Sequence, residues 1–175
     1  MRFDEDIKIA GDKPSESLDK KETFNVKRES TESVLKAKKI GALVAEKFLE
    51  DTDISDDENF KNAEMLLQRR LLLSFAATIG FDTYMQDDSL AGIAQKSFLD
   101  SIKKVSYEFY RSSSDTGAFS FYYLAYRRGD DIERRIGQTF AMLCSHDGDP
   151  IYQELGEALY CWFLSVVKET VLANQ

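Results

Sequence analysis

Apolar side chains recur at three- and four-residue steps from residue 31 to the C-terminus, and this helical period limits the possible folds more than any other feature. Between Thr31 and Asp51 one stripe carries Val34, Ala37 and Phe48. The stretch 66–79 is apolar on nearly every side, which indicates a helix enclosed by others. With only 2 Pro and 9 Gly, and no Asn-Gly between alternating runs, strand signals are nearly absent. The pattern predicts an all-α fold.

Residues that are typical of helix ends divide residues 31–175 into five to six helices, which we expect to form a single-domain bundle. Ser55 and Glu58 form a capping-box pattern, and Gly80 marks an expected helix end or kink. Asp130 is expected to cap a helix with Glu133 three residues later. The expected helices cover about 31–51, 55–79, 87–112, 117–128, 130–144 and 150–173, and Asp147-Gly148-Asp149-Pro150 is the sharpest boundary between them.

Residues 1–30 differ from the rest of the chain and are interpreted as a charged, mobile N-terminal tail. They hold seven basic and eight acidic residues, the breakers Gly11 and Pro14, and few large apolar groups. Such a segment buries too little apolar surface to offset the entropy lost on ordering.

The chain is acidic, with 31 Asp and Glu against 23 Lys and Arg and a formal charge of −8. This balance argues against nucleic acid and anionic membranes as partners, because both attract positive surfaces. The first residues lack the apolar stretch of a signal peptide, and no apolar run reaches the length of about 20 residues that a membrane span needs. Two cysteines without paired spacing fit a reducing compartment, so we expect a cytoplasmic protein.

Aromatic residues are densest in the expected helix 117–128, where four of them share one face. Eight of the 21 aromatic residues fall between Tyr107 and Tyr126. The shared face consists of Phe119, Tyr122, Tyr123 and Tyr126, while Phe121 and Leu124 point elsewhere. The ordinary interpretation is the edge of the core; a protein interface and a small-ligand pocket are the two alternatives, because tyrosine suits sites with one dry and one wet end.

Arginines follow directly, in the segment YRRGDDIERR. A guanidinium binds phosphate or carboxylate groups through two parallel hydrogen bonds, so Arg127 and Arg128 are candidates for a small-anion site. The competing interpretation is structural, since Asp130–Arg134 and Asp131–Arg135 have the i, i+4 spacing of ion pairs on a helix. Arg69 and Arg70 interrupt the most apolar helix and need a partner that the sequence does not identify.

Catalytic signals are sparse. Glu154 and Glu157 lie one helical turn apart and could hold Mg²⁺, which makes a magnesium-dependent nucleotide hydrolase the weakest of the hypotheses. Cys144, His146 and Cys161 are too few soft ligands for a structural zinc site, and no phosphate-cradling glycine loop is present. We expect no cofactor.

These patterns favour a non-enzymatic helical protein that acts through protein–protein contact, either with another protein or by self-association through the Tyr-rich helix. The first alternative is a phosphate- or nucleotide-binding protein that uses residues 122–135. The second is the hydrolase built on Glu154 and Glu157.

Overall fold

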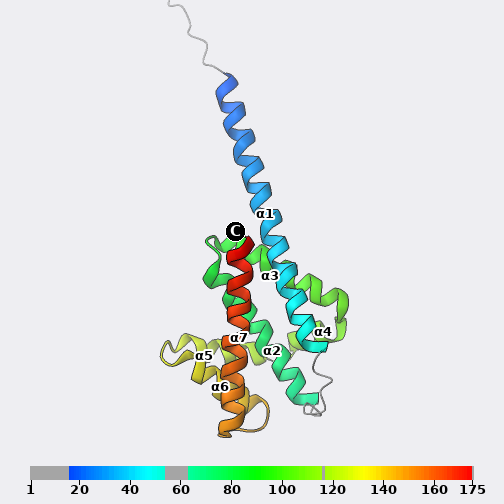
Figure 1. Cartoon of the computed structure of the whole chain (residues 1–175), viewed down its shortest axis with the longest axis vertical. Coiled ribbons are helices and arrows are strands. Elements are labelled where there is room, and N and C mark those ends of the chain that lie inside the picture. Colours follow the sequence, from blue (N-terminus) through cyan, green and yellow to red (C-terminus); the bar gives the residue numbers. More distant parts are fainter. Residues whose placement is uncertain (1–15, 54–62, 116, 175) are drawn as a thin grey trace, which may run out of the picture. The chain divides into compact units, whose positions relative to one another are not determined.

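The computed structural model describes residues 16–53, 63–115 and 117–174, and these residues contain helices and no strand. The all-α prediction is confirmed for them. The helices are α1 (Glu16–Asp53), α2 (Ala63–Tyr84), α3 (Asp88–Val105), α4 (Tyr107–Asp115), α5 (Ala118–Arg127), α6 (Ile132–Leu143) and α7 (Pro150–Asn174) (Figure 1).

The chain divides into two compact units, residues 1–32 and 33–175. In the first unit, the part that the structure describes begins at Glu16 and is the first portion of α1. Helix therefore covers residues 16–30, where the sequence predicted a tail without regular structure. The part of the predicted tail at residues 1–15 lies outside the described residues, and the mobility of the whole segment 1–30 stays a prediction.

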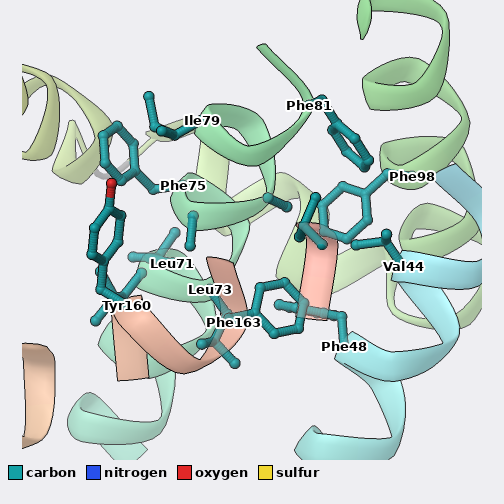
Figure 2. Packing of buried hydrophobic residues seen from close by; sticks show 14 of the residues in the cluster. Val44, Phe48, Leu71, Leu73, Phe75, Ile79, Phe81, Phe98, Tyr160 and Phe163 are labelled. Carbon is teal, nitrogen blue, oxygen red and sulfur yellow. The ribbon is translucent and has the colours of Figure 1, made fainter. Parts of the chain in front are cut away.

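In the second unit, α2 is the central helix, as its all-round apolar sequence predicted. Residues 71–81 are all buried, and α2 packs against α3, α5, α6 and α7. Figure 2 shows two aromatic groups around this helix. Phe48 meets Phe98 and Phe163 at ring-centroid distances of 5.6 and 6.2 Å, and Phe75 stacks on Tyr160 at 6.4 Å.

Two glycines allow close helix packing. The N-terminal half of α7 lies beside α6, where a Cβ at Gly137 would overlap the carbonyl oxygen of Gln153. A Cβ at Gly80 would lie 2.6 Å from Cγ1 of Val167, so α7 also packs closely on α2. Of the helix end or kink expected at Gly80, the helix end is wrong: residues 81–84 continue α2 to Tyr84, and Gly80 serves contact with α7.

The described residues form seven helices rather than five or six, because the expected helix 87–112 is divided. At Ser106 the backbone leaves the helical conformation (φ −137°, ψ 83°), and its amide donates to the carbonyl oxygen of Ile102 as a C-cap. The carbonyl oxygen of Ser106 accepts from the amide of Tyr110, so α4 begins directly after this break. The second piece, α4, runs through the serine triplet that was expected to stop the helix.

Two of the predicted helix starts are confirmed and one is wrong. Oδ1 of Asp87 accepts hydrogen bonds from the amides of Ser89 and Leu90, and α7 begins at Pro150 as expected. By contrast, Asp131 rather than Asp130 is the N-cap of α6; it has a left-handed backbone (φ 49°) and its carboxylate makes no capping bond. The capping box at Ser55 lies outside the described residues.

Candidate functional site

The inward face of α5 belongs to the core. Phe75 of α2 contacts all four predicted residues, with ring centroids at 6.0 Å from Phe119, 5.4 Å from Tyr122, 5.3 Å from Tyr123 and 6.4 Å from Tyr126. Tyr122 is fully buried, Phe119 and Tyr126 are half-buried, and Tyr123 is 39% exposed. For this face the geometry therefore agrees with the ordinary interpretation, a core edge.

Tyr122 illustrates why this face is unsuited to polar recognition. Its hydroxyl is buried and has no hydrogen-bond partner among the described residues. Burial, and to a smaller extent the nearby Cys144 thiol, holds the pKa of Tyr122 well above its usual value. The hydroxyl thus stays neutral and inside the protein.

One of the grooves in the described surface lies on the opposite face of α5. Phe121 is 48% exposed and Leu124 62% exposed, and Met142 of α6 is 40% exposed beside them. Together with Ala125, Arg128, Arg135, Gln138, Thr139 and Asp147, they line a groove of about 260 Å³. We call this set of nine residues the α5–α6 groove. Three large apolar side chains are therefore exposed around one hollow.

Arginine side chains line the polar part of the groove. Arg135 is oriented by a 2.6 Å hydrogen bond from its Nε to the carbonyl oxygen of Asp130. The ion pairs Asp130–Arg134 and Asp131–Arg135 are absent from the described residues, and Arg135 donates to the backbone instead. The groove thus holds two guanidinium groups, from Arg128 and Arg135, against one carboxylate, from Asp147.

Of the predicted site residues only Arg128 lines the groove, and Phe121, Leu124 and Met142 were not predicted as site residues. The only signal was that α5 is apolar around its whole circumference, which predicts enclosure by something without saying which face the domain itself covers. Arg127 is exposed and does not line the groove.

The two arginines of α2 have different surroundings. Nη2 of Arg69 donates to Oδ1 of Asp51 at 2.7 Å, and both side chains are 13% exposed. The guanidinium carbon of Arg70 lies 6.0 Å from the Phe109 ring centroid, a cation–π distance. Burial raises the pKa of Asp51, and this effect outweighs the lowering by Arg69. The 2.7 Å hydrogen bond identifies Asp51 as an acid partner of Arg69.

The candidate metal ligands do not converge. Among the residues that the structure describes, no group of three or more His, Cys, Asp or Glu side chains could hold a metal ion. Glu154 is exposed and Glu157 is half-buried on α7, without a third carboxylate to complete a site. The hydrolase hypothesis therefore gains no geometric support.

The thiols and the imidazole are also separate. Cys144 is buried, and burial raises the pKa of its thiol to about 12, whereas Cys161 is exposed. The ring of His146 stacks on Tyr152 at 3.8 Å. A nucleophile next to its base is therefore not formed by these three residues.

Comparison with known proteins finds no family model, no curated protein and no solved structure that matches this chain. Within the described ranges, none of the helices has both the length and the apolar character that crossing a membrane requires.

Proposed function

We propose that the chain is a non-enzymatic, cytoplasmic protein that acts through protein–protein contact, and that its α5–α6 groove binds an acidic amphipathic helix of a partner. The observation that carries the proposal is the exposure of Phe121, Leu124 and Met142 around one groove. In this proposal the bundle of residues 33–175 carries the binding surface, and residues 1–30 take no part in it.

The apolar side chains account for affinity. Burial of apolar surface contributes roughly 25 cal/mol per Å², and peptide helices dock by placing apolar residues at i, i+3, i+4 and i+7 into such grooves. A groove of about 260 Å³ is small for a drug-sized ligand, since ligand pockets are typically about 300–1,000 Å³. It has room for one or two side chains of a larger partner.

The charges account for selectivity. Two guanidinium groups against one carboxylate give the groove a locally positive character on an acidic protein. Glutamate residues flanking the apolar stripe of a partner helix could pair with Arg128 and Arg135, whereas lysines would be repelled. This charge complementarity favours an acidic partner over a second copy of the same groove, in which like charges would meet.

The test uses two fluorescent helical peptides of about 18 residues with the same leucine stripe, one flanked by glutamate and the other by lysine. Fluorescence anisotropy should give a Kd of about 10–100 µM for the acidic peptide and binding at least about tenfold weaker for the basic one. Leu124→Asp should weaken binding of the acidic peptide by about tenfold or more, because it places a carboxylate in the groove.

A matched control is available on α1. Leu35 is 60% exposed, close to the 62% of Leu124, and lies outside the groove, so Leu35→Asp should leave binding unchanged. Equal effects of the two substitutions would contradict the proposal. So would tight binding of inorganic phosphate that is lost in Arg128→Ala while neither peptide binds, an outcome that would support the small-anion alternative instead.

A further inference from the structure

A second exposed apolar surface lies on α7, outside the α5–α6 groove. Ile151 is 73% exposed and Trp162 45% exposed; Ala158 is also exposed, and Leu155 is half-buried. We call these four residues the α7 stripe. Their alternating four- and three-residue steps are the a/d spacing by which two helices pair along their length.

One acidic and one basic residue beside the stripe lie at equal distances before and after Cys161. Two antiparallel copies of α7 can therefore place opposite charges next to each other. Glu154 lies seven residues before Cys161 and Lys168 seven residues after it, and all three are exposed. Nζ of Lys168 lies 5.7 Å from the Tyr84 ring centroid, which holds the ammonium group along this edge. If two copies of α7 run antiparallel with Cys161 at the two-fold axis, each Glu154 faces Lys168 of the second copy. A parallel pairing makes no such match.

The same register matches side-chain sizes. With Cys161 on the axis, Leu164 of the second copy lies directly opposite Ala158, so Trp162 lies two residues from that point and packs beside Ala158, a large residue next to a small one. Ala158 and Trp162 also line a groove of about 250 Å³, together with Leu155, Leu159, Asp51 and Arg69, which leaves room for the facing indole. By the same offset of two residues, Leu155 lies beside Ser165 of the second copy, and Glu169 marks the end of the apolar part.

We propose that the protein forms a two-fold symmetric homodimer through the α7 stripe, with antiparallel helices centred on Cys161. The occupant of this surface is therefore a second copy of the chain, and the α5–α6 groove of each copy is left for a different partner. The proposal stands independently of the function proposed above.

The first test is sedimentation equilibrium of the full chain between about 5 and 200 µM, a range that brackets the association expected of one helix pair. The dimer should appear as a species of twice 20.0 kDa at the upper end of the range. Glu154→Lys and Lys168→Glu should each weaken dimerisation by about tenfold, since both create like-charge pairs across the axis. The double variant restores opposite charges and should recover the wild-type affinity. Lys96→Glu, an exposed charge on α3, is the matched control and should have no effect.

The second test uses the thiols. Cys161 is exposed and Cys144 buried, so a short bismaleimide should link two native chains through Cys161 alone, and Cys161→Ser should abolish the product. The proposal is overturned by a 20.0 kDa species at every concentration, or by a dimer that is neither cross-linked at Cys161 nor sensitive to charge reversal. Leu124→Asp separates the two proposals, because it should abolish peptide binding and leave the dimer intact.

Discussion

Replacing Tyr122 by phenylalanine should stabilise the protein. The Tyr122 ring is fully buried and stacks on Phe75 at 5.4 Å, and its hydroxyl has no hydrogen-bond partner among the described residues. A buried polar group without a partner costs about 1–3 kcal/mol relative to water. Tyr122→Phe removes that group and keeps the ring contact, so we expect the free energy of unfolding to rise by about 1 kcal/mol.

The assay is urea and thermal denaturation followed by circular dichroism. For a chain of this size a gain of about 1 kcal/mol raises Tm by roughly 2–4 °C. The control is Tyr123→Phe. The Tyr123 side chain is 39% exposed, so removal of its hydroxyl should leave the free energy of unfolding nearly unchanged. If Tyr122→Phe lowers stability by about 1 kcal/mol or more, the hydroxyl has a partner and the assignment of Tyr122 to an apolar core edge is wrong.

Other predictions follow from glycine packing and thiol burial. Gly137→Ala should destabilise the protein by about 1–3 kcal/mol, because its Cβ would overlap the backbone of α7, whereas Gly92→Ala meets open space on α3 and should stabilise by about 0.5–1 kcal/mol. Chemical denaturation measures both; equal effects would contradict the α6–α7 contact. A thiol reagent at pH 8 should modify Cys161 but not Cys144 in the native protein, because Cys144 is buried and its pKa is raised to about 12. Mass spectrometry of the labelled peptides checks this, and rapid labelling of Cys144 would show that the core opens around it.

The sequence predicted those features that depend on neighbouring residues along the chain. The caps at Asp87 and at the start of α7 were found because a capping side chain or a proline acts within one helical turn. The central place of α2 followed from its apolar circumference, which is a property of that segment alone.

Features that depend on helix packing were not predicted. Gly80 suggests a helix end or kink when only its own helix is considered, but α2 runs through it, and the contact with Val167 explains why a glycine stands there. Likewise, the apolar residues of α5 could be divided into core and surface only after Phe75 was placed against one face. Phe121 and Leu124 then remained on the other face, where they form the candidate site.

The central claim, that the α5–α6 groove binds a partner helix, is tested most directly in the unmodified protein by methionine methyl NMR. The chain has four methionines, and Met142 lines this groove, whereas Met65 and Met85 pack against the core elsewhere. Titration with the acidic peptide should shift the Met142 methyl signal along a curve that gives the same Kd as anisotropy, while the signals of Met65 and Met85 stay in place. A bound peptide that leaves the Met142 signal unmoved would contradict the claim.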